Sequence, residues 1–295
     1  MPFHKNSDVS LFYTDSEGTG PPVLFLHGWA CDSHDWSYQI PFLISLGYRV
    51  IAMDHRGHGR STSPSPPSSP SSELNSSPPP PSSSGYSLSA LASDAASLLT
   101  HLSTGPVILI AHSMGTVIAS LLTISHPTLI RALILAHPIY SGVPPALPLM
   151  AARMRSLSSS SPAQIPVLAA DFFSKLMYTP QTPSWLKTWQ IRRVLGCEPE
   201  MLVGCVDGIV DIFDSVMGQT EACKAFMQKR TVPRLVVCTE AIPGAEAWER
   251  ELGVREGVDE VWVLGGGTFA HMVEHERFNG ILGEWLKKGG LPGGE

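Results

Sequence analysis

The sequence predicts an α/β protein with a mostly parallel central sheet flanked by helices and with an inserted helical cap. Short runs rich in valine, isoleucine and leucine alternate with longer segments of helical periodicity, as parallel strands alternate with crossover helices. One of these runs passes into a helix within five residues. Residues 139–232 contain no strand-like run, and their amphipathic patches favour helices.

The abrupt strand-to-helix turn lies in residues 107–123, whose sequence is VILIAHSMGTVIASLLT. Val107–Ile110 has the composition of a buried parallel strand, and the apolar residues that follow Gly115 share one face of a helix. So tight a turn strains the residue at its apex and requires small residues on either side, here Ala111 and Gly115. We therefore expect Ser113 to project from the carboxyl end of the strand as a nucleophile, as in the G-x-S-x-G turn.

The chain before this turn supplies strands expected at Leu11–Tyr13, Val23–Leu26 and Tyr48–Met53, and helices expected at Asp35–Leu46 and Leu88–Leu102. Ligand sites of parallel sheets gather at the carboxyl ends of strands, and one of these strands ends at His27-Gly28-Trp29. We expect the backbone N–H groups of Trp29 and Met114 to form an oxyanion hole, because such donors stabilise developing negative charge. His27 itself is expected to be structural.

Residues 63–85 consist almost entirely of serine and proline. A segment of this composition neither buries apolar surface nor forms a regular hydrogen-bonded ladder. We therefore predict a disordered insertion within the core domain. The alternative is a proline-rich ligand for a partner domain.

The chain after the turn continues with strands expected at Arg131–Ala136, Pro233–Cys238 and Glu260–Leu264, and with helices at Ala245–Leu252 and over the last residues. We expect residues 1–138 and 233–295 to form the core domain and residues 139–232 to form the cap. The methionine and aromatic side chains of the cap favour an apolar pocket, although any single one is more often a core residue. The expected substrate-binding residues are Trp29, Phe172, Phe173 and Trp185.

Three motifs, in this order and spacing, resemble the α/β-hydrolase superfamily: HGW followed by DW in residues 27–36, DHRGHGRS in residues 54–61, and AHSMG in residues 111–115. The resemblance implies the α/β-hydrolase fold of a capped, serine-nucleophile branch. That branch is similar to small esterases, lactonases, cofactor-free haloperoxidases and C–C hydrolases, and loosely to hydrolases of fungal secondary metabolism. It also implies that DHRGHGRS is a structural turn.

A serine hydroxyl is a weak nucleophile that needs a neighbouring base, and the base needs a third group to orient it. The resemblance implies a catalytic histidine between the last strand and the C-terminal helix. His271 occupies that part of the chain and is our expected base for Ser113, with His275 as the competing candidate. We expect His112 to be structural.

The acid of this triad is less determined. The family carries it in a G-x-x-D arrangement after the strand Pro233–Cys238, but this chain continues TEAIP, with Ala241 or Ile242 at the usual position. Glu240 is the only carboxylate of that loop and is our candidate acid; the alternative is a solvated side chain. A dyad without an acid also stays open, as do three aspartates that share one face of a cap helix: Asp207, Asp211 and Asp214.

Composition argues against several other classes of function. A net charge of −6 and a pI near 6.0 give no electrostatic attraction to nucleic acid or anionic membranes. No apolar run approaches the ~18 residues of a membrane span, and the N-terminal residues lack the apolar core of a signal peptide. The cysteines have no metal-ligand spacing, and we expect reduced thiols in a cytoplasmic protein: Cys31, Cys197, Cys205, Cys223 and Cys238.

These observations predict a serine hydrolase that uses no cofactor or metal, acts on a small apolar ester or lactone, and has no obligate protein partner. A serine nucleophile argues against the epoxide hydrolase and haloalkane dehalogenase chemistry of this fold, which uses a carboxylate. A C–C bond hydrolase or an acyltransferase would use the same residues. The alternative from another class is a ligand-binding protein that kept the fold and lost catalysis, which the missing aspartate favours.

Overall fold

The computed structural model describes residues 2–64, 85–139 and 146–288. The insertion expected to be disordered, residues 63–85, lies outside these residues except at its two ends, and that expectation stays a prediction. None of the described helices combines the length and the apolar character that crossing a bilayer requires. All five cysteines are free thiols, as expected.

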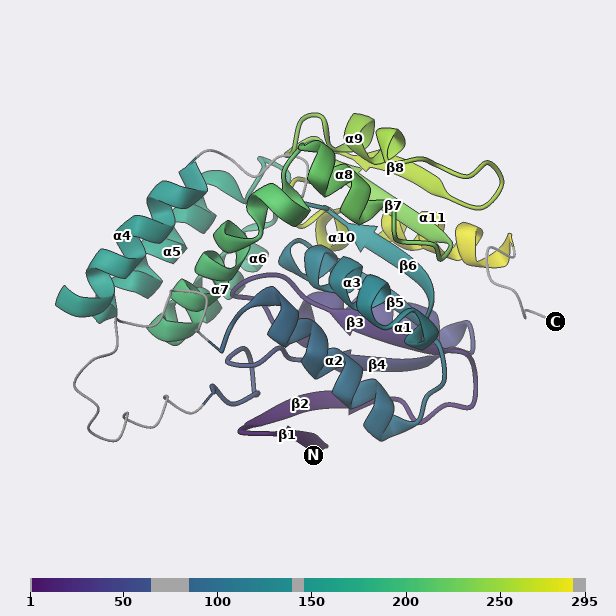
Figure 1. Cartoon of the computed structure of the whole chain (residues 1–295), viewed down its shortest axis with the longest axis horizontal. Helices are drawn as coiled ribbons and strands as arrows, with labels where there is room; N and C mark the ends of the chain where they lie inside the picture. The colour runs from purple at the N-terminus through teal and green to yellow at the C-terminus, as the bar shows by residue number, and fades with distance from the viewer. Residues whose placement is uncertain (1, 65–84, 140–145, 289–295) are drawn as a thin grey trace.

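The described residues form an eight-stranded sheet in the order β1-β2-β4-β3-β5-β6-β7-β8 (Figure 1). β1 and β2 pair antiparallel with each other, and β2 pairs antiparallel with β4. From β4 to β8 every neighbouring pair is parallel, which confirms the predicted mostly parallel sheet. The strands are β1 (Phe3–Asn6), β2 (Val9–Asp15), β3 (Pro22–Leu26), β4 (Arg49–Met53), β5 (Val107–His112), β6 (Ile130–Ala136), β7 (Arg234–Thr239) and β8 (Glu260–Leu264).

Each face of the sheet carries its own apolar core, because alternate residues of a strand point to opposite faces. In β3, Leu24 and Leu26 belong to the core that also holds residues of α2 and α3, whereas Val23 and Phe25 belong to the core shared with α1 and α11. The nearly continuous apolar runs of the sequence thus correspond to strands covered on both faces. The core helices are α1 (Gln39–Ser45), α2 (Leu88–Leu102), α3 (Met114–Ser125), α9 (Ala245–Glu251), α10 (Ala270–Val273) and α11 (His275–Lys287).

The helix expected at Asp35–Leu46 is divided in the structure. It forms a single 3-10 turn, η1 (Ser33–Trp36), followed by α1, which begins at Gln39. Pro41 explains the division, because proline has no backbone N–H to donate and is tolerated only in the first turn of a helix. A start at Gln39 places Pro41 in that first turn.

Five described α-helices follow β6 and precede β7, where the helical cap was expected. They are α4 (Ala146–Ser160), α5 (Ile165–Leu176), α6 (Ser184–Leu195), α7 (Pro199–Asp211) and α8 (Glu221–Met227), and we call them the cap helices. α4 to α7 lie together on the left of Figure 1. Their helical character agrees with the expectation, whereas the division of the chain into core and cap domains stays a prediction.

Candidate active site

The turn between β5 and α3 has the strained geometry that the sequence predicts. Ser113 has φ 51° and ψ −121°, a conformation that the β-carbon of an L-residue disfavours. Its N–H donates to the carbonyl of Ala136 at 3.1 Å, and its carbonyl accepts from Thr116 Oγ1 at 2.6 Å. A β-carbon on Gly115 would lie 2.7 Å from the carbonyl oxygens of Leu26 and His27. Position 115 therefore admits only glycine without a shift of the backbone.

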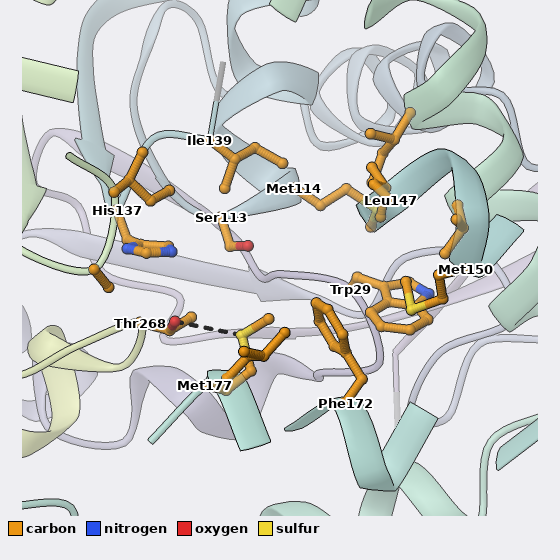
Figure 2. A pocket seen from close by; sticks show the side chains of 15 residues that line it. Trp29, Ser113, Met114, His137, Ile139, Leu147, Met150, Phe172, Met177 and Thr268 are labelled. Carbon is orange, nitrogen blue, oxygen red and sulfur yellow. Dashed lines mark hydrogen bonds between the residues drawn. The ribbon is translucent and has the colours of Figure 1, made fainter. Parts of the chain in front are cut away.

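The side chain of Ser113 faces a cavity of about 210 Å³ between the carboxyl end of the sheet and the cap helices (Figure 2). Most of its fifteen lining residues are apolar, as expected from the methionine and aromatic content of the cap segment. They are Trp29, Ser113, Met114, His137, Ile139, Leu147, Met150, Phe172, Leu176, Met177, Val206, Ile209, Ala241, Ile242 and Thr268. His137 is the one lining side chain of the described residues that carries a basic group.

The expected substrate-binding residues fall into three groups. Trp29 and Phe172 line the cavity. Phe173 is buried behind them, with its ring 5.8 Å from that of Trp29, and lines a smaller adjoining space of about 30 Å³. Trp185 is 53% exposed on α6 and does not line the cavity, so its assignment was wrong. Helical periodicity alone did not show which face of α6 the indole occupies.

No hydrogen bond joins His271 to Ser113, contrary to expectation. Its imidazole is buried, does not line the cavity, and packs against Trp36 and His112 with ring centroids 4.7 and 4.3 Å away. Neither of its ring nitrogens has a hydrogen-bond partner, so none reaches the serine hydroxyl. The loop after β8 instead directs Thr268 into the cavity.

The local backbone explains this correction. Gly267 has φ +72° and turns the chain, so that Thr268 faces the cavity while His271 follows on the short helix α10. His275, the competing candidate base, lies still further along the chain. Its ring stacks on Tyr38 at 3.8 Å, and it does not line the cavity either.

The candidate acids also lie outside the cavity. Glu240 is exposed, and the residues of its loop that reach the cavity are Ala241 and Ile242. Asp207 pairs with Arg155 at 2.5 Å. Asp211 and Asp214 are exposed. No carboxylate is among the lining residues that the structure describes, and the assignment of Glu240 beside the base is therefore corrected.

His137 was not considered from the sequence, although a signal was present. It follows the apolar strand β6 directly, at the same carboxyl edge as Ser113. Its backbone has φ 52°, and its Nδ1 lies 2.6 Å from Thr239 Oγ1 at the end of β7. Burial lowers the pKa of His137 to about 3, with a smaller contribution from His112, so the imidazole is uncharged near neutral pH.

One group of described residues has the ligand types of a metal site. Asp35, His112 and His271 are buried and place one ligand atom each within 4.8 Å of the others. Nε2 of His112 already donates to the carbonyl of Thr268 at 2.8 Å, and the Asp35 carboxylate pairs with Arg193 at 2.7 Å. The guanidinium would repel a cation bound beside it. We therefore interpret Asp35, His112 and His271 as a structural cluster, in which His112 holds the loop at Thr268 through its hydrogen bond.

Comparison with known proteins shows the family. Residues 21–175 match the family model described as alpha/beta hydrolase fold, and the chain belongs to this family. Both the predicted fold and the predicted hydrolase family are thereby confirmed.

Curated relatives align over part of the chain. A non-heme haloperoxidase of Rhodococcus erythropolis is 39% identical over 116 residues, which are 39% of this chain and 35% of that protein. Epoxide hydrolase 3 of Siraitia grosvenorii is 33% identical over 143 residues, 48% of this chain and 40% of that protein. The aligned part thus spans well under half of the length of these relatives.

Solved structures resemble the chain over nearly its whole length. The enol-lactonase from Burkholderia xenovorans LB400 has a TM-score of 0.75 at 17% identity and covers 97% of this chain and 100% of its own. A thermophilic esterase from Thermogutta terrifontis has a TM-score of 0.75 at 22% identity, with 95% and 94% covered. At these identities the likeness is one of fold.

Proposed function

We propose that this protein hydrolyses small apolar esters or lactones through a covalent acyl-enzyme on Ser113. One observation carries the proposal: a serine held in a strained turn at the end of β5 presents its side chain to an apolar cavity. Strain of this kind persists only where the surrounding fold enforces it, and it is concentrated at functional positions.

Two backbone amides support acyl transfer. Met114 begins α3, and Trp29 follows the end of β3, so both N–H groups lie at the edge of the sheet where Ser113 stands. Both residues line the cavity, and neither amide donates to an acceptor in the part of the chain that the structure describes. Unused donors beside a nucleophile are suited to a developing oxyanion.

The cavity supports a small apolar substrate. Its volume of about 210 Å³ lies below the range of roughly 300–1,000 Å³ that is usual for drug-sized ligands. The cap helices supply alkyl and thioether groups to the described lining, among them Leu147, Met150 and Leu176, and no charged group. The names of the structural neighbours, an enol-lactonase and an esterase, agree with such a substrate.

A second candidate function is ligand binding without catalysis. The absence of a carboxylate from the described lining and the position of His271 outside it favour this alternative. Both functions use the same cavity, so only reactivity at Ser113 separates them.

The test is covalent labelling with a fluorophosphonate probe, followed by mapping of the modified peptide and by assays with short acyl esters and lactones. We expect modification of Ser113 and turnover of at least one substrate. Ser113→Ala should abolish both, and Ser125→Ala, at an exposed serine on the same helix, should change neither. Absence of labelling and of turnover in the wild type would reject the hydrolase and favour the binding protein.

A further inference from the structure

We propose that His137 is the catalytic base of Ser113 and that the Thr239 hydroxyl orients its imidazole. The inference rests on the proposed hydrolase function and identifies the group that makes the serine reactive. It replaces His271, which the structure places outside the cavity.

The topology of the sheet places the three residues side by side. β5, β6 and β7 are neighbouring parallel strands, and the last paired residues of β5 and β6 are His112 and Ala136. Ser113 and His137 are the next residues of these strands, and neighbouring strands are about 4.8 Å apart. Both line the same cavity. In Figure 2 the His137 ring lies on one side of Ser113 and the serine hydroxyl points to the other, so the proton transfer requires a rotation of the serine side chain.

The hydrogen bond to Thr239 selects the useful tautomer. Nδ1 of His137 lies 2.6 Å from the Thr239 hydroxyl, which can accept the Nδ1 proton. Nε2 then carries the lone pair, and the structure describes no other partner for this ring nitrogen. A neutral imidazole with an accepting Nε2 at the cavity is the form that a general base requires.

Backbone strain gives an independent argument. Six described residues other than glycine have a positive φ, and two of them, Ser113 and His137, line this cavity at adjacent strand ends. A positive φ at a histidine is uncommon and costs free energy unless the fold enforces it. The N–H of His137 donates to the carbonyl of Val237 at 2.8 Å, which holds the residue in this conformation.

The other loops at this edge offer no substitute. The loop after β7 contributes Ala241 and Ile242 to the cavity, and the loop after β8 contributes Thr268. None of these side chains accepts a proton near neutral pH. His137 is therefore the one side chain with a basic group in the described lining of this cavity.

The reaction would proceed in two balanced steps. The oxygen of Ser113 attacks the substrate carbonyl carbon while its proton passes to Nε2 of His137. The C–O bond to the leaving alcohol then breaks, and the alkoxide takes that proton. Water attacks the acyl-enzyme, gives a proton to the same nitrogen, and the proton returns to Ser113 as the acid leaves.

The decisive experiment compares two histidine variants of the full chain by fluorophosphonate labelling and ester turnover. We expect His137→Gln to slow both by about 100-fold or more, which is the usual contribution of a general base. His275 is partly exposed and stacks on Tyr38, so His275→Gln should keep the wild-type rates of labelling and ester turnover. Far-ultraviolet circular dichroism and melting temperature verify that each variant is folded.

Two further readouts separate catalysis from a structural role. His137→Gly removes the ring and suits the positive φ, and added imidazole should restore labelling in this variant and not in Ser113→Ala. Thr239→Val removes the orienting hydroxyl, and kcat should fall more than KM changes. The wild-type labelling rate should also hold nearly constant from pH 8 to pH 5.

The flat pH profile follows from the surroundings of His137. Burial and the nearby rings of His112 on β5 and His271 on α10 keep these histidines uncharged, and Thr239 on β7 carries no charge. A base with an ordinary histidine pKa would lose activity tenfold per pH unit below about 6.5.

Labelling of Ser113 at the wild-type rate in His137→Gln would overturn the inference and leave the hydrolase standing. Absence of labelling in the wild type would reject the hydrolase itself.

Discussion

The strain at Ser113 should be measurable as a stability difference between two inactive variants. Ser113→Ala and Ser113→Gly both remove the hydroxyl, but only Ser113→Gly removes the β-carbon that disfavours φ 51° and ψ −121°. Both variants lack the hydroxyl, so the difference between their free energies of unfolding reports only the effect of the β-carbon on the backbone.

The magnitude follows from two opposing contributions. A residue held in a sparsely populated region costs ~1–3 kcal/mol, and glycine loses ~0.4–1 kcal/mol more than alanine through the freedom of its unfolded chain. The net gain for Ser113→Gly over Ser113→Ala is therefore between zero and about 2.6 kcal/mol. An unfolding entropy of ~2.1 cal/mol/K per residue converts this gain to a melting temperature up to about 4 °C higher in a chain of 295 residues.

The assay is thermal and urea unfolding of both variants, with Ser174 as a matched control. Ser174 is exposed within α5, where alanine should exceed glycine in stability by ~1 kcal/mol. The two sites should therefore show opposite signs. Lower stability of Ser113→Gly than of Ser113→Ala, as at position 174, would refute the strained-turn interpretation.

Three more perturbations test the supporting structure. Gly115→Ala places a β-carbon 2.7 Å from two carbonyl oxygens and should lower the free energy of unfolding by ~1–3 kcal/mol and slow labelling, as measured by urea titration and probe kinetics. Glu249→Gln removes a carboxyl oxygen that accepts from the buried Arg230 and Arg234, 3.1 and 2.6 Å away, and should lower the free energy of unfolding by about 3–5 kcal/mol in the same titration; a loss below 1 kcal/mol would contradict it. Burial lowers the pKa of His55 to about 3 and of His58 to about 4, so the unfolded chain binds more protons below pH 6.5. Stability should therefore fall as pH decreases from 7 to 5, and equal urea midpoints at the two values would exclude this linkage.

The fold could be predicted because it is specified by patterns that extend over many residues. The parallel strands from β3 to β7 are nearly continuous apolar runs. Such runs are buried on both faces, which is typical of the central strands of a parallel sheet covered by helices. The turn at Ser113 could also be predicted from residue types. The backbone contacts at position 115 leave no room for a side chain, and the glycine that they require is visible in the sequence. Helix boundaries were less certain, as the division at Pro41 shows.

The partners of Ser113 could not be predicted, because loop geometry decides which side chain of a loop faces the cavity. Thr268 and His271 are only three residues apart, yet Thr268 in the loop after β8 lines the cavity and His271 on α10 does not. The left-handed turn at Gly267 determines that outcome, and no pattern of residue types encodes it. The same applies to the loop after β7, where Ala241 lines the cavity and the neighbouring Glu240 does not.

The polar groups of this cavity differ in how firmly the fold places them. Ser113, His137 and Thr239 stand at the ends of three adjacent strands, so sheet hydrogen bonds fix their spacing. Thr268 and Ala241 come from longer connections and contribute no proton acceptor. Groups on rigid elements hold reactive geometry better than groups on loops. A base from a loop is therefore not required by our proposal, which takes the base from the end of β6. If His137 proves dispensable, the base must come from another group, and labelling of Ser113 in the wild type still decides between hydrolysis and ligand binding.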